Sequence, residues 1–80
     1  MIISVEVSLY PLQKNYRSAV KDFIERIAQN TKLNINYSAM STTLVGEFQE
    51  IMPILNNEIF NTLTDIPESV FVIKLSGGCH

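Results

Sequence analysis

Residues 3–10 read ISVEVSLY, and Pro11 follows them. Apolar and polar residues alternate strictly along this stretch, and several are β-branched, so we expect a strand from residue 2 to residue 10 with one buried face. The residues expected toward the core are Ile3, Val5, Val7 and Leu9, and those expected on the other face are Ser4, Glu6, Ser8 and Tyr10. The second face is polar but carries only one charged residue, Glu6. The function of the chain depends on whether this face meets water or something that replaces water.

The rest of the chain predicts two helices and three more strands. We expect a helix over residues 16–30, a strand over 33–40, a short strand over 43–46, a helix from 47 or 48 to about 63, and a strand over 70–75. Apolar residues recur at spacings of three and four along both helices, which indicates that one side of each helix lies on the sheet. Pro53 interrupts the second helix, so we expect this helix to begin near residue 49 or 50 or to kink.

The order strand, helix, strand, strand, helix, strand predicts an α+β fold, the ferredoxin-like βαββαβ sandwich. Its four-stranded antiparallel sheet carries both helices on one face and leaves the other face open. The 80 residues are expected to form a single domain, 1–80. A domain of this size buries only about 60% of its unfolded surface, so we also expect self-association into a homo-dimer or homo-tetramer.

Composition excludes several classes of protein. With 46% hydrophobic and 18% charged residues the chain is globular, and its apolar runs are too short to cross a membrane. The net charge is −2 and the six basic residues are dispersed, so no nucleic acid is expected as a partner. The amino terminus lacks the basic region and cleavage site of a signal peptide, which favours a cytoplasmic protein.

Neither a metal site, a cofactor nor an enzymatic activity is expected. Cys79 and His80 are adjacent at the carboxy terminus and are the only cysteine and histidine, so they cannot supply the four ligands of a structural metal site. No nucleophile stands beside a base, no pair of carboxylates marks a pocket, and no glycine-rich loop separates a strand from a helix.

Two segments resemble the thiamine-binding protein family, the YkoF-like proteins. They are SVEVSLYPL at residues 4–12 and MSTTLVGEFQEIM at residues 40–52, and the resemblance extends over nearly the whole chain. It implies the fold given above and association through the sheets into dimers or tetramers. It also implies a possible ligand, because some members of the family bind thiamine or its hydroxymethylpyrimidine moiety.

Individual residues match the family unequally. Ser8 matches a small hydroxyl position before Pro11, Thr42 matches the threonine that opens the third strand, and Gly46 matches the glycine or alanine that ends it. The position before Gly46 is commonly acidic in the family, whereas this chain has Val45. An acidic side chain there would accept a hydrogen bond from an aminopyrimidine, so its replacement by valine leaves the identity of the ligand open.

Two hypotheses follow for the open face. In the first, a small molecule, thiamine or a pyrimidine precursor, binds through hydroxyl, amide and carboxylate groups with an aromatic ring stacked beside it. The candidate ligand-binding residues are Glu6, Ser8, Tyr10, Asn36, Ser38, Thr42 and Thr43. In the second, the chain is a non-enzymatic structural or regulatory oligomerisation module, and the same polar residues form an ordinary solvated or subunit-facing surface.

Overall fold

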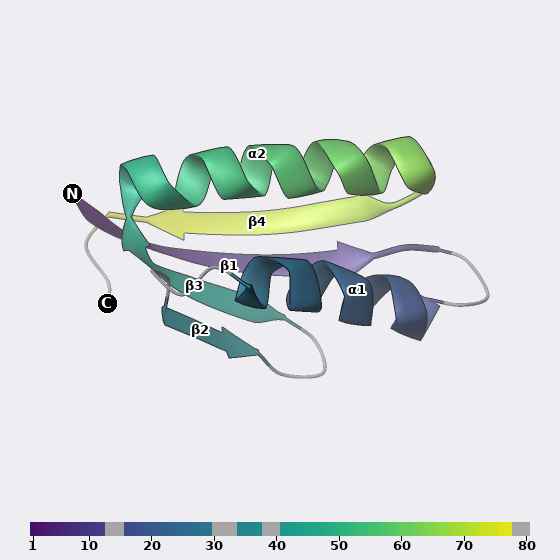
Figure 1. Cartoon of the computed structure of the whole chain (residues 1–80), viewed down its shortest axis with the longest axis horizontal. Helices are drawn as coiled ribbons and strands as arrows, with labels where there is room; N and C mark the ends of the chain where they lie inside the picture. The colour runs from purple at the N-terminus through teal and green to yellow at the C-terminus, as the bar shows by residue number, and fades with distance from the viewer. Residues whose placement is uncertain (13–15, 30–33, 38–40, 78–80) are drawn as a thin grey trace.

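The computed structural model describes residues 1–12, 16–29, 34–37 and 41–77. The elements come in the predicted order: β1 (Ile2–Tyr10), α1 (Tyr16–Ala28), β2 (Asn34–Tyr37), β3 (Thr42–Glu47), α2 (Phe48–Asp65) and β4 (Val70–Ser76). The strands form one four-stranded sheet in the order β2-β3-β1-β4, and each neighbouring pair is antiparallel (Figure 1). The chain therefore has the predicted α+β ferredoxin-like fold.

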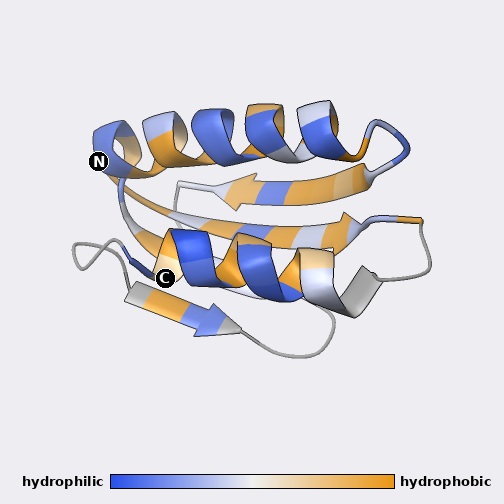
Figure 2. Cartoon of the chain, turned by 45° about the vertical axis from the view of Figure 1, so that its right-hand side comes forward, coloured by the Kyte–Doolittle hydropathy of each residue, from blue (hydrophilic) through white to orange (hydrophobic). Residues whose placement is uncertain are grey.

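The hydrophobic core lies between the sheet and the two helices. β1 contributes Ile3, Val5 and Val7, whose side chains are at most 2% exposed, as the alternating pattern predicted. The same cluster contains Phe23 and Ile27 of α1, Leu44 of β3, and Ile51 and Leu55 of α2. Both helices therefore pack on one face of the sheet, and their apolar stripes run along the side nearest the strands (Figure 2). In the part of the chain that the structure describes, the other face of the sheet carries no helix.

The ends of the elements differ from the prediction by a few residues. α1 ends at Ala28, two residues before the predicted end, which lies outside the described residues. β3 begins one residue earlier than expected, at Thr42, and extends to Glu47. Of the strand predicted over residues 33–40, the structure describes residues 34–37 as β2. Each difference lies at an end, where local sequence patterns are least decisive.

The second helix accommodates its proline. α2 begins at Phe48, within the predicted start at residue 47 or 48, and continues through Pro53 to Asp65, so only the alternative of a late start near residue 49 or 50 is wrong. The side chain of Pro53 is exposed, so its ring does not displace the core. A proline inside a helix has no N–H for the carbonyl four residues earlier, here that of Gln49. Neither helix in the described part of the chain is long and apolar enough to span a membrane.

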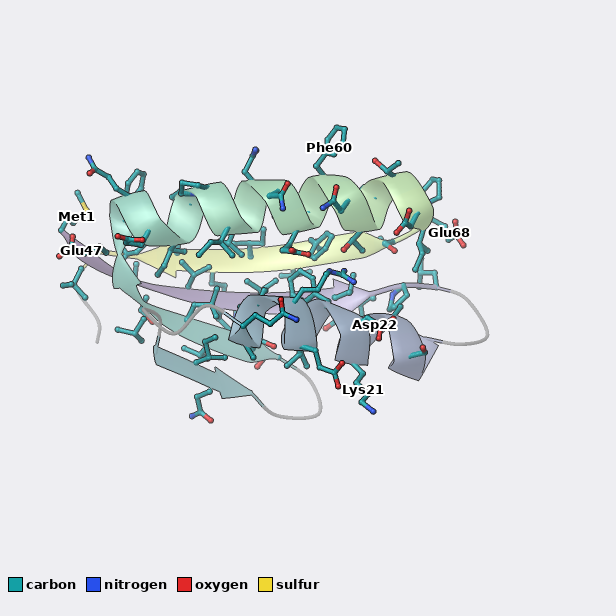
Figure 3. The ribbon with its side chains drawn as sticks, viewed as in Figure 1. Met1, Lys21, Asp22, Glu47, Phe60 and Glu68 are labelled. Atoms are coloured by element: carbon teal, nitrogen blue, oxygen red, sulfur yellow. The ribbon has the colours of Figure 1, made fainter. Side chains whose placement is uncertain are left out.

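The start of α2 is held by the first residue of the chain. The N–H of Phe48 donates to the backbone oxygen of Met1 at 3.0 Å, which satisfies a donor that the helix itself leaves unpaired. The N-terminal ammonium group of Met1 donates to Oε2 of Glu47 at 2.9 Å, and Figure 3 shows the two residues side by side. The side chain of Glu47 makes no capping hydrogen bond to the helix, so the β1 terminus takes over the capping role.

A polar contact joins the two helices beside the core. Nε of Arg26 on α1 donates to Oε1 of Glu58 on α2 at 2.5 Å, and Nη2 of Arg26 donates to Oγ1 of Thr62 at 3.5 Å. Arg26 lies on the exposed side of α1, where its side chain is 40% exposed, and it reaches across to a glutamate whose side chain is only 12% exposed. The sequence pattern gave no sign of this contact.

Candidate functional site

The face of the sheet without helices carries the polar half of β1. Ser4, Glu6 and Ser8 are half-buried and alternate with the core residues, and Tyr10 at the end of the strand is 41% exposed. Because paired residues of antiparallel strands share a face, the register shows what lies beside each of them. We call this surface the open face.

One row of polar residues crosses the entire sheet on the open face. Asn36 of β2 pairs with Thr43 of β3, Thr43 pairs with Glu6 of β1, and Glu6 pairs with Lys74 of β4. Neighbouring strands lie about 4.8 Å apart, so each member is within side-chain reach of the next. Three of the predicted site residues, Asn36, Thr43 and Glu6, therefore lie in one row.

The fourth member of the row, Lys74, is absent from the sequence-based site. Its Nζ lies 3.7 Å from Oε1 of Glu6, and the two side chains are 75% and 45% exposed. An ion pair this exposed contributes about 0–1 kcal/mol, so a ligand can replace either partner at small cost. The sequence predicts a strand over residues 70–75 without assigning its faces, and only the pairing of β4 with β1 shows that Lys74 lies on the face of Glu6.

The open face becomes apolar toward the end of β1. Tyr10 pairs with Val70 and Ser8 pairs with Val72, and the two valines are 46% and 45% exposed. This end of the face offers a phenol ring and two aliphatic side chains, whereas the row through Glu6 offers charges and hydrogen-bonding groups. The sequence-based site contained Tyr10 and neither valine, because their proximity depends on the same long-range pairing.

Thr42 does not lie with the other predicted site residues. It pairs with Val7 of the core and is 3% exposed, so its side chain lies on the helix-facing side of the sheet. Thr42 and Thr43 are consecutive in one strand, and consecutive side chains point to opposite faces. The placement of Thr42 at the open face is therefore corrected.

Two further positions complete the comparison with the predicted site. Ser38 lies outside the described residues. Val45, at the position where the resemblance led us to expect an acidic residue, is half-buried and pairs with Ser4 on the open face, next to the row through Glu6. Among the described residues, no three side chains of the metal-binding types converge.

Comparison with solved structures shows how widely this fold occurs. A Streptococcus pneumoniae protein superimposes with a TM-score of 0.87 at 20% identity, covering 99% of this chain and 89% of its own. A Methanocaldococcus jannaschii protein gives a TM-score of 0.80 at 28% identity, covering 98% and 81%. A Thermotoga maritima protein proposed to act in thiamine biosynthesis or salvage gives 0.80 at 19% identity, covering 95% and 83%.

The family assignment comes from the sequence itself. No curated protein matches the chain. The sequence profile of the YKOF-related family matches residues 2–79, nearly the full length. This match confirms the resemblance drawn from the first strand and from the segment around the third, and the chain belongs to the YKOF-related family.

Proposed function

We propose that this protein binds thiamine or its hydroxymethylpyrimidine moiety on the open face without catalysing a reaction. Three findings support the proposal: membership of the YKOF-related family, the shared fold with a Thermotoga maritima protein proposed to act in thiamine biosynthesis or salvage, and the polar row across the sheet. The row carries the argument, because it belongs to this chain and has the chemistry that the ligand requires.

The aminopyrimidine ring presents a donor and an acceptor side by side, since its amino group adjoins a ring nitrogen. Glu6 and Lys74 present the complementary pair on neighbouring strands, a carboxylate that accepts and an ammonium that donates. Thr43 stands next to Glu6 on the other side and offers a hydroxyl that donates or accepts. These three groups suffice to orient a flat ring across β3, β1 and β4.

The apolar end of the open face suits the second ring of thiamine. Tyr10 lies four residues after Glu6, a distance of about 13 Å along a strand, so one pyrimidine ring does not reach both. A thiazolium ring linked to the pyrimidine extends past Ser8 toward Tyr10, where its positive charge interacts favourably with the phenol ring. Val70 and Val72 provide aliphatic contact there.

Glu6→Gln tests the polar half of the site. The substitution keeps the shape and removes the charge, so we expect affinity for thiamine and for hydroxymethylpyrimidine to fall by about 10- to 100-fold, the loss of a hydrogen bond to a charged group. Isothermal titration calorimetry measures both affinities. Glu25→Gln on the exposed side of α1 is the matched control and should leave them unchanged. Equal binding by Glu6→Gln and the wild-type protein would remove Glu6 from the site.

Tyr10→Ala tests the apolar half separately. Only thiamine carries the thiazolium ring, so its affinity should fall by about 2- to 5-fold while that of hydroxymethylpyrimidine stays unchanged. The same titrations with both ligands measure this difference. A parallel loss for both ligands would mean that the pyrimidine itself sits at Tyr10, which would reverse the proposed orientation.

The exposed apolar residues of β4 favour the second hypothesis, an oligomerisation module without a ligand. The two functions separate cleanly in the same experiment. If neither ligand produces heat or a thermal shift at millimolar concentration while the protein self-associates, the module without a ligand is the function. If thiamine binds and is recovered chemically unchanged after incubation, the function is ligand binding without catalysis.

A further inference from the structure

The open face has a second row of residues beside the polar row, toward the start of β1. In this row Ser4 of β1 pairs with Val45 of β3 on one side and with Ser76 of β4 on the other. Successive residues on one face of a strand lie about 7 Å apart, so the second row is within the reach of a ligand ring held at Glu6. These three residues carry no charge, so the chemistry of the face changes sharply here.

Val45 is the apolar member of the second row. Thr43 and Val45 lie on the same face of β3, and their β-branched side chains have nearly the same shape. The step from one to the other therefore exchanges a hydroxyl for a methyl group while the shape of the surface is kept. Ile2, which is 38% exposed, is a diagonal neighbour of Val45 across the strands and extends the apolar surface.

The polar row is thus bounded by apolar groups on both sides along the strands. Val72 lies on one side of it, opposite Ser8, and Val45 lies on the other, opposite Ser4. The side chains of the second row are short, whereas those of Glu6 and Lys74 are long. A ligand group can therefore lie close to Val45 while the two charged side chains reach the edge of its ring.

The substituents of the pyrimidine ring match this arrangement. Carbon 5 of the ring carries the methylene group that leads to the thiazolium, and carbon 2, on the opposite side of the ring, carries a methyl group. In the orientation proposed above, carbon 5 points toward Ser8 and Tyr10. Thr43 and Lys74 lie on opposite sides of Glu6, so the ring lies over β1 and β3 when its amino edge faces β4. Carbon 2 then points between Ser4 and Val45.

We propose that Val45 determines which group the site accepts at carbon 2 of the pyrimidine ring. The ligand class is a 4-aminopyrimidine with an alkyl group at this carbon. This inference rests on the proposed function, which supplies the orientation of the ring. A methyl group packed on Val45 leaves water at no cost in hydrogen bonds. A carbonyl oxygen at the same place loses its water on the side of Val45, which has no donor to replace it.

Three ligands test the preference of the wild-type protein. They share the 4-amino and 5-hydroxymethyl groups and differ at carbon 2: hydroxymethylpyrimidine has a methyl group, 4-amino-5-hydroxymethylpyrimidine has hydrogen, and 5-hydroxymethylcytosine has oxygen. In calorimetric titrations we expect the methyl compound to bind about 3- to 10-fold more tightly than the hydrogen compound, the effect of burying one methyl group. The oxygen compound should bind about tenfold or more weakly than the methyl compound.

Val45→Thr tests the residue itself. The variant keeps the shape of the side chain and replaces a methyl group by a hydroxyl, so the preference for methyl over hydrogen should largely disappear. Affinity for the hydrogen compound should stay within about 2-fold of the wild-type value, because that ligand makes little contact with Val45. Val72→Thr is the matched control, since it makes the same exchange on the same face at the opposite side of the polar row. It should keep the preference for methyl.

The possible results separate this inference from the function on which it rests. If the wild-type protein binds hydroxymethylpyrimidine but does not distinguish methyl from hydrogen, or if Val45→Thr keeps the preference, Val45 is not the determinant and the proposed function stands. If the wild-type protein binds none of the three ligands, both are refuted. Loss of the preference in Val72→Thr alone would place the methyl group at the other end of the face and overturn the inference.

A second variant covers the case in which Val45→Thr does not fold, as judged by circular dichroism. Val45→Ile remains apolar and β-branched, and its additional methyl group takes the space of the methyl group at carbon 2. Its preference for methyl over hydrogen should fall below that of the wild-type protein. An unchanged preference in Val45→Ile would refute contact between Val45 and carbon 2.

Discussion

The contact between Arg26 and Glu58 can be tested through its effect on the stability of the protein. Glu58→Ala leaves the guanidinium group without its carboxylate at a site where Glu58 is only 12% exposed. We expect the free energy of unfolding to fall by about 1.5–3 kcal/mol, the range for a hydrogen bond between charged groups. Urea denaturation followed by circular dichroism measures it.

The pair of Lys21 and Glu25 provides the matched control. It also joins a basic to an acidic residue, at 3.9 Å, but its side chains are 75% and 61% exposed. Water screens such a pair, so Glu25→Ala should change stability by no more than about 0.5 kcal/mol. Similar losses of unfolding free energy for Glu58→Ala and Glu25→Ala would show that the partial burial of Glu58 does not strengthen its contact with Arg26.

Single residues also show where sequence reasoning is sufficient. The faces of Ile3, Val5 and Val7 were predicted correctly because period-two alternation is a local property. The contact of Arg26 with Glu58 was not predicted, because a long exposed side chain can reach a neighbouring helix and its partner lies 32 residues away in sequence. Thr42 was placed among the site residues although its neighbour Thr43 already occupies the open face.

Among the elements, α2 carries the clearest prediction. Pro53 removes one backbone hydrogen bond from the helix and is exposed, so it contributes little packing in return. Pro53→Ala restores the N–H that the carbonyl of Gln49 lacks, and we expect it to stabilise the protein by about 2–3 kcal/mol. Asn56→Ala, at another exposed position of α2, should gain well under 1 kcal/mol. Thermal unfolding of both variants gives the comparison, and equal shifts would contradict a specific backbone effect.

The pairing of the strands explains why the β4 side of the open face was missed. Each strand was predicted from its own composition, and β1 and β2 supplied the polar candidates Glu6, Ser8 and Asn36. Lys74, Val70 and Val72 entered the site only through the pairing of β4 with β1, strands separated by about sixty residues. A local pattern fixes which side chains share a face of one strand, whereas register across a sheet follows from long-range packing.

At the scale of the whole molecule, small size and an uncovered edge have one common consequence. An 80-residue chain has a limited core, and the self-association expected from the sequence would bury exposed apolar side chains of β4 and add contacts that a single copy lacks. Stability would then be linked to association, because mass action favours the folded oligomer.

The melting temperature should therefore rise with protein concentration. For a chain of this size that unfolds as a dimer, we expect about 3–5 °C for each tenfold increase. Calorimetry over a hundredfold range of protein concentration measures this. Leu75→Lys, at a β4 position that is 49% exposed, is expected to lose the dependence, and Phe60→Lys, at an α2 position that is 68% exposed, to keep it. A melting temperature constant over the whole range would mean that each copy is as stable alone, and that the exposed side chains of β4 add nothing to folding.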